Sequence, residues 1–271
     1  FFFSYPFSIA FFFFFHWVFI LIYKQLWMSN NNNNNNNNLR YYSPDPSSQA
    51  PMETKHAMMG FPCVEKCSSR NREKHSIVAD LDGTLTIGGS PFPYYMLMAL
   101  EGGSLLRAII LMALSPLAWL LHTFISEESG IKLFIFLTFA GLKLKDIEGV
   151  ARAVLPRFYA EEIHPESWRI FSSCQRYRGV VTSNPRVMVE FFCKNHLGAD
   201  KVLGSELQVT KGGRATGFVL SSSGVLVGAR KLNAIKEEFG DQIPDVGLGH
   251  QATDRPFLQL CKVHLKKNTM I

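Results

Sequence analysis

The stretch SIVADLDGTL at residues 76–85 decides the fold of this chain. Residues 76–79 form a short, mostly apolar run with two β-branched side chains, which predicts a buried strand that ends at Asp80. Residues 180–182 and 245–249 predict two similar strands, and helical patterns lie between them. Strands that alternate with helices indicate an α/β fold, a parallel sheet with helices on both faces. The active site of such a fold lies at the carboxyl ends of its strands.

Two carboxylates, Asp80 and Asp82, stand two residues apart directly after the first strand and should point the same way from the sheet. Phosphoryl transfer to an enzyme carboxylate needs an aspartate nucleophile beside a divalent cation. It also needs a second acid that protonates the leaving oxygen and later activates water. Gly83 permits a tight turn there, and Thr84 can brace it. A plain acidic turn is the alternative reading, but the flanking residues favour phosphoryl transfer.

Further side chains follow in the order that this chemistry requires. Thr182 ends the second strand and could donate its hydroxyl to a phosphoryl oxygen, with Ser183 as the alternative donor. Lys231 precedes a helical pattern and could neutralise the charges of aspartate and phosphate, a role for which Lys211 and Arg230 compete. An acidic motif is expected after the third strand, where the chain reads GHQATD.

Together, Asp80, Thr182, Lys231 and Asp254 resemble the four signatures of haloacid-dehalogenase (HAD) phosphatases. Five further stretches narrow the resemblance: FPYY at 92–95, SPLA at 115–118, ARAVLP at 151–156, NPR at 184–186 and GGRATGF at 212–218. They resemble the amino-terminal domain of land-plant glycerol-3-phosphate acyltransferases that act at the sn-2 position. The resemblance covers roughly residues 60–262.

This resemblance implies an endoplasmic-reticulum membrane protein whose site faces the cytosol and which supplies the lipid polyesters cutin and suberin. A carboxyl-terminal domain would transfer an acyl group from acyl-CoA to glycerol 3-phosphate. In some members the amino-terminal domain then removes phosphate from lysophosphatidic acid. The resemblance makes Asp80 the nucleophile and Asp82 the acid/base. It makes Thr182 a phosphate ligand and Lys231 the charge stabiliser, with Asp80, Asp82 and Asp254 at a Mg²⁺ site.

One departure from the family pattern concerns His250, which stands where the fourth signature normally has an aspartate. Mg²⁺ prefers oxygen ligands, whereas imidazole suits zinc and later transition metals. We therefore predict that Mg²⁺ binding and phosphatase activity are weak or lost. The alternatives are that Asp254 takes over the ligand role and activity survives, or that the domain is a non-catalytic membrane-docking unit.

The insertion at residues 88–179 holds two apolar stretches, residues 104–125 and 131–142, joined by a short acidic turn. They predict a helical hairpin that serves either as a cap over the active site or as a membrane insertion, and we favour contact with the membrane. The net charge of +6 comes from scattered basic residues. This pattern lacks the basic stripe of a nucleic-acid binder and suits anionic lipid headgroups.

The two ends of the chain lie outside the domain at residues 75–262. Residues 1–28 form an apolar segment that begins without Met, and we interpret it as a gene-model extension rather than an anchor. Residues 29–74, with nine consecutive Asn at 30–38, are expected to be a linker. Residues 263–271 resemble no part of the family, and the acyltransferase half is missing, so we read the chain as truncated.

Overall fold

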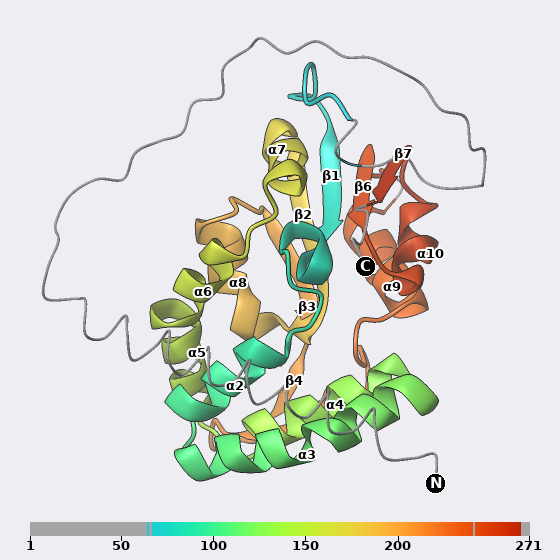
Figure 1. Cartoon of the computed structure of the whole chain (residues 1–271). Helices are drawn as coiled ribbons and strands as arrows, with labels where there is room; N and C mark the ends of the chain where they lie inside the picture. Colours follow the sequence, from blue (N-terminus) through green and yellow to red (C-terminus); the bar gives the residue numbers. More distant parts are fainter. Residues whose placement is uncertain (1–63, 65–66, 241, 267–271) are drawn as a thin grey trace, which may run out of the picture. The chain divides into compact units, whose positions relative to one another are not determined.

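A computed structural model describes residue 64, residues 67–240 and residues 242–266 of the protein. The expectations for residues 1–28 and for most of the linker therefore lie outside the described residues. A five-stranded sheet organises the described part, in the order β3-β2-β1-β6-β7, with every neighbouring pair parallel (Figure 1). Its strands are β1 (Ser76–Asp80), β2 (Tyr177–Pro185), β3 (Lys201–Ser205), β6 (Val246–Gly249) and β7 (Val263–Lys266).

Helices cover both faces of this sheet. On one face, Val78 of β1 and Val181 of β2 pack against Ile235 of α9 (Ala229–Phe239) and against α10 (Arg255–Leu258). The connection from β2 to β3 runs through α8 (Arg186–Asn195), which Figure 1 shows with α7 (Pro165–Ser173) across the sheet from α9 and α10. The predicted α/β class is thus confirmed.

Between β1 and β2 the chain forms a series of helices joined by short loops, and the last of these helices is α7. The insertion helices are α2 (Phe92–Glu101), α3 (Leu105–Phe124), α4 (Glu127–Phe139), α5 (Leu144–Ala153) and α6 (Leu155–Glu161). The predicted hairpin is present as α3 and α4. The insertion ends slightly earlier than expected, because β2 already begins at Tyr177.

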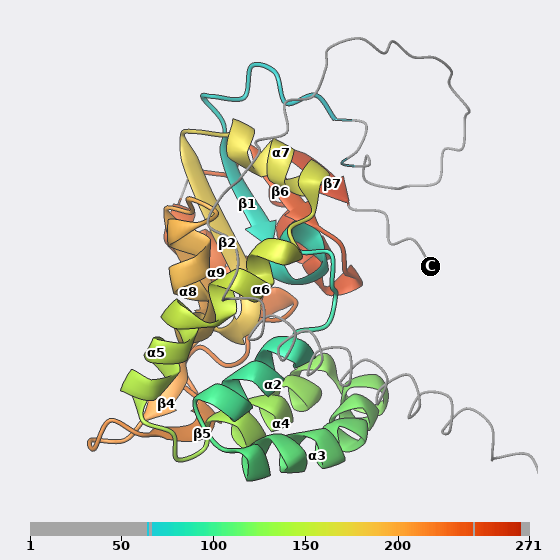
Figure 2. The ribbon, with the colours of Figure 1, turned by 60° about the vertical axis from the view of Figure 1, so that its left-hand side comes forward.

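A small antiparallel arm, β4 (Leu207–Val209) and β5 (Ala215–Val219), reaches from the sheet to the insertion (Figure 2). It lies against α4, where the Gly141 N–H donates to the Ala215 carbonyl at 2.8 Å and the Phe136 and Phe218 rings lie 5.5 Å apart. The arm therefore fixes α4 to the body of the domain.

The expectation that the chain leaves the domain after Lys262 is wrong for the next four residues. Residues 263–266 form β7, which pairs in parallel with β6 from Val246 to Gly249. Because the short run VHLK lies at the edge of the sheet and carries two basic residues, its sequence alone gives little strand signal.

At the amino ends of the strands, Asp245 joins β1 to the start of β6. Its carboxylate accepts from the N–H of Ser76 at 2.9 Å, from the Ser76 hydroxyl at 3.0 Å and from the Lys262 ammonium at 2.7 Å. Burial alone would raise the pKa of Asp245, but these donors outweigh burial and lower the pKa to about 2.

We expect Asp245→Asn to lower the free energy of unfolding at pH 7 by roughly 1–2 kcal/mol, allowing for the solvent exposure of Lys262. A carboxylate whose pKa is depressed by folding stabilises the protein above its unfolded pKa, and this contribution is lost as the pH falls. The difference in the free energy of unfolding between Asp245→Asn and the unsubstituted chain should therefore vanish as the pH drops from about 4 to about 2. Urea titrations across this range measure it, with Glu237→Gln on the exposed side of α9 as control. A difference that persists unchanged at pH 2 would contradict the prediction.

Candidate active site

The carboxyl end of β1 leads directly into a tight turn, η2 (Leu81–Leu85). Gly83 has a positive φ of 72°, a backbone conformation that favours glycine. Space is also short, because a Cβ on Gly83 would lie 2.5 Å from Nε2 of His250 and 3.0 Å from Cα of Gly89. The turn therefore requires glycine both for conformation and for the close approach of His250.

Lys231, in the first turn of α9, connects two buried aspartates. Its Nζ lies 2.7 Å from Oδ1 of Asp80 and 2.7 Å from Oδ1 of Asp254, which ends η3 (Ala252–Asp254). Neither competing cation takes this position, because Lys211 is exposed and Arg230 pairs with Glu128 at 2.6 Å. Side chains from β1, α9 and the segment after β6 thus meet at one edge of the sheet.

The two aspartates share a single ammonium group and titrate as a pair. Burial alone would raise the pKa of Asp80, but Lys231 and His250 hold it below its usual value. Burial, followed by the charge of Asp80, raises the pKa of Asp254. Asp80 is therefore the carboxylate that stays ionised most readily, as a nucleophile must.

Asp82 faces β2 instead of the ammonium group. Its Oδ2 accepts from Thr182 Oγ1 at 3.2 Å and from Asn184 Nδ2 at 2.7 Å. Burial, followed by the charge of Asp80, raises the pKa of Asp82 to about 7. Its Oδ1 is buried and has no hydrogen-bond partner within the part of the chain that the structure describes. A carboxyl group with this pKa can both give and take a proton near neutral pH.

The structure distinguishes Thr182 from Ser183, the two hydroxyl donors between which the sequence did not decide. Thr182 reaches Asp82, but Ser183 does not join it, because successive side chains of a strand point to opposite faces. The Ser183 carbonyl instead accepts from the Ser205 hydroxyl at 2.6 Å. The same alternation brings Asn184 into the site. Sequence reasoning missed this residue, although its spacing of two from Thr182 would have indicated it.

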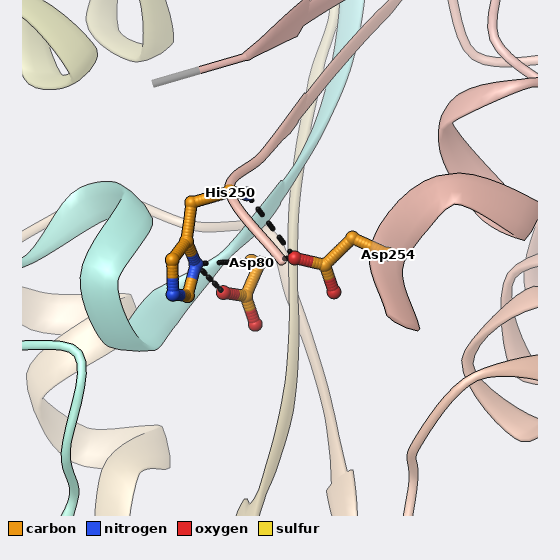
Figure 3. A group of neighbouring side chains, drawn as sticks. All are labelled: Asp80, His250 and Asp254. Carbon is orange, nitrogen blue, oxygen red and sulfur yellow. Dashed lines mark hydrogen bonds and ion pairs between the residues drawn. The ribbon is translucent and has the colours of Figure 1, made fainter. Parts of the chain in front are cut away.

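His250 lies over Asp80 (Figure 3). Its Nδ1 is 3.1 Å from Thr84 Oγ1, 3.4 Å from Asp80 Oδ2 and 3.9 Å from Asp254 Oδ2. The Thr84 hydroxyl has one proton and donates it to Asp80 Oδ2 at 3.1 Å. We therefore assign a proton to Nδ1 of His250, which makes the imidazole a hydrogen-bond donor beside Asp80.

Asp80, His250 and Asp254 offer ligand atoms that all lie within 4.8 Å of one another and could hold a metal ion. Oδ2 of Asp254 already accepts from the backbone N–H of His250 at 3.2 Å and of Gln251 at 3.0 Å. Two carboxylates that are already hydrogen-bonded and one imidazole are a poorer donor set for Mg²⁺ than the oxygen ligands in octahedral geometry that this ion prefers. This donor set suits a borderline transition metal better. Asp82, predicted as a metal ligand, is turned towards β2 and stands outside this group.

Comparison with known proteins identifies the domain. The family described as "Glycerol-3-phosphate acyltransferase RAM2-like, HAD-like domain" matches residues 76–266. The chain belongs to this family. The match includes β7, in agreement with the parallel pairing of that strand.

Two relatives of this RAM2-like chain are both named glycerol-3-phosphate acyltransferases. It is 55% identical over 183 residues to glycerol-3-phosphate acyltransferase RAM2 of Petunia hybrida, covering 67% of this chain and 38% of that protein. It is 33% identical over 225 residues to glycerol-3-phosphate acyltransferase 1 of Arabidopsis thaliana, covering 78% of this chain and 37% of the relative. The chain thus spans less than half the length of these curated relatives.

Solved structures support the HAD-like fold of this RAM2-like domain. A protein of unknown function from Bordetella pertussis superposes with a TM-score of 0.52 at 13% identity, covering 69% of this chain and 86% of that one. A phosphoserine phosphohydrolase-like protein from Francisella tularensis gives a TM-score of 0.50 at 11% identity, covering 70% and 84%. Similarity at this level establishes the fold alone.

Proposed function

We propose that this RAM2-like domain is a phosphoryl-transfer site of weakened activity that acts on lysophosphatidic acid or on a glycerol 3-phosphate-like monoester. The arrangement around Asp80 carries the proposal. Lys231 lies 2.7 Å from both Asp80 and Asp254, and His250 stands beside Asp80 at the position where the family resemblance implies an acidic ligand.

In this proposal each step of the reaction belongs to a residue of the site. A carboxylate oxygen of Asp80 attacks phosphorus, and the bond from phosphorus to the leaving oxygen breaks while Asp82 donates its proton to that oxygen. Asp82 then removes a proton from water, which adds to phosphorus, so that phosphate leaves and Asp80 is regenerated. Thr182 and Asn184 orient Asp82 for both proton transfers, and Lys231 stabilises the negative charge.

The proposed weakness of the phosphatase activity follows from the same arrangement of side chains. A bound dication would neutralise the two aspartates and the incoming phosphate, and it is the largest local charge in such a site. His250 supplies neither the negative charge nor the oxygen that Mg²⁺ prefers, and its ring packs against the turn at Gly83. We therefore infer that Mg²⁺ binds weakly or not at all.

The names of the relatives support a wider proposal for the protein in which this domain serves. We infer transfer of an acyl group from acyl-CoA to glycerol 3-phosphate, at the endoplasmic-reticulum membrane and with the site facing the cytosol. Cutin or suberin synthesis is the role that the family resemblance implies. Expression of a tagged chain in plant cells, followed by membrane fractionation, would test the proposed location.

Phosphate release from lysophosphatidic acid, measured with Mg²⁺ or Mn²⁺, tests the proposed activity. We expect slow turnover that falls to background in Asp80→Asn, because the substitution removes the nucleophile. Rapid turnover by the unsubstituted chain would contradict the weakening. If the unsubstituted chain and Asp80→Asn release phosphate at the same rate, the domain is a non-catalytic membrane-docking unit. The exposed apolar surface of α3 favours this alternative.

A further inference from the structure

The outer face of α3 is apolar along most of its length and is not covered by the described part of the chain. It consists of Leu105, Leu106, Ile109, Ile110, Ala113 and Leu117, all of which are exposed, Leu106 to 67%. Trp119, in the next turn, is 58% exposed. With 20 residues at about 1.5 Å each, the helix presents this surface over about 30 Å. Apolar patches of this extent mark interaction sites.

The opposite face of α3 packs against the rest of the domain. Ala108, Leu111, Ser115 and Ala118 are buried at helical spacing, and the Ser115 hydroxyl donates to the Met112 carbonyl at 2.8 Å. Arg107 is turned towards the end of α4, where its guanidinium donates to the carbonyls of Leu137, Thr138 and Ala140 at 2.8–3.1 Å. The only Arg of α3 is therefore engaged away from the outer face, and the helix contains no Asp, Glu or Lys.

The contacts that fix α4 to the domain limit how the outer face of α3 can meet a partner. α4 is tied at its start by Glu128, which pairs with Arg230 of α9 at 2.6 Å, and just beyond its end by Gly141, which bonds to β5. Gly130 lets the two helices approach closely, since a Cβ there would lie 2.8 Å from the Ala118 carbonyl oxygen. By length and composition α3 could cross a membrane. If α3 crossed a membrane, it would have to separate from α4. If α3 instead lies flat on a membrane surface, all of these contacts remain in place.

We propose that α3 is an in-plane membrane-docking helix, which inserts its outer face into the acyl-chain boundary of a lipid bilayer while α4 holds it against the domain. This inference rests on the proposed membrane location and names the surface that would carry it. Helices of this kind bury their apolar face about 5–10 Å deep.

The chemistry of the outer face favours lipid over a protein partner. Protein interfaces carry about one hydrogen bond per 100–200 Å² and are enriched in Tyr and Arg. From Leu105 to Leu117 the outer face exposes aliphatic side chains only, so it has nothing with which to form such bonds. Trp119 lies two residues beyond Leu117, on the flank of the helix, and tryptophan is enriched where a membrane meets water.

Fluorescence of the full chain with phosphatidylcholine vesicles tests the proposal. The difference between the emission of the unsubstituted chain and of Trp119→Phe isolates this residue from the other three tryptophans. We expect the Trp119 emission to shift to the blue on addition of vesicles and to be quenched by brominated acyl chains. Leu106→Ser with Ile110→Ser should weaken this response on the order of 10-fold. Ile243→Ser, at a 47% exposed position outside α3, should leave it unchanged.

The possible outcomes distinguish a failure of the α3 proposal from a failure of the proposed membrane location. Vesicle binding without quenching of Trp119 would overturn the role of α3 and leave membrane association through another segment. No vesicle binding would overturn both. A blue shift that grows with protein concentration in the absence of lipid would assign the outer face to a second copy of the chain. Because the Trp119 signal depends only on the unsubstituted chain and Trp119→Phe, a misfolded double variant would still leave the test decisive. Phosphatase activity enters none of these readouts.

Discussion

His250→Asp is expected to raise Mg²⁺-dependent phosphate release from lysophosphatidic acid by at least about 10- to 100-fold, the effect that even outer-shell partners have on metal sites. The substitution puts a third carboxylate beside Asp80 and Asp254 and removes the imidazole from the turn at Gly83. Without a cation, three neighbouring carboxylates repel one another, and the single ammonium group of Lys231 that contacts Asp80 and Asp254 cannot neutralise all three. The variant should therefore unfold at a lower temperature than the unsubstituted chain, and Mg²⁺ should restore its stability by mass action.

His250→Asn is the matched control, because it has the size of aspartate but no charge. If activity rises equally in His250→Asn and His250→Asp, release of a steric block explains the gain, and the metal-ligand interpretation is wrong. Adding Asp80→Asn to the aspartate variant should abolish the gained activity. The thermal shift with Mg²⁺ gives a second readout that does not depend on turnover.

Lys231→Met is expected to destabilise the fold by about 3–5 kcal/mol, the cost of leaving buried charges without their partner. Lys231 is 3% exposed and is the ammonium that both Asp80 and Asp254 contact. Methionine matches its length and apolar stem, so the loss reports the charge rather than a cavity. Urea denaturation followed by circular dichroism at pH 7 measures the effect.

The neighbouring residue offers a close control for this experiment. Arg230 lies on the same helix turn, but its side chain is 44% exposed and its partner is Glu128. Exposed ion pairs contribute about 0–1 kcal/mol, so Arg230→Met should change stability little. Losses of equal size in the two variants would show that the buried charges are not held by Lys231. Combining Lys231→Met with Asp80→Asn should recover part of the loss, because one unpartnered charge is removed.

Local patterns in the sequence were sufficient for the class of the fold and for much of the site. An apolar run that ends at Asp80 indicates a buried strand with carboxylates at its end, because strand formation and turn formation depend on nearby residues. The helical hairpin followed from two apolar stretches, and the departure at His250 was visible without coordinates. The family comparison supports the resemblance on which these predictions drew.

From the sequence alone came the carboxylate pair Asp80 and Asp82, their candidate partners at Thr182, Lys231 and Asp254, and the elements that carry these residues. Only the tertiary structure distinguished Lys231 from Arg230 and Lys211, distinguished Thr182 from Ser183, brought Asn184 into the site and showed which face of α3 the described residues leave uncovered. It also placed Asp82 against Thr182 and Asn184 of β2 and added β7 to the sheet. The physical reason is that these choices depend on strand register and helix packing, which bring together residues 100 or more positions apart, such as Asp82 and Thr182. Spacing along the chain records none of that geometry.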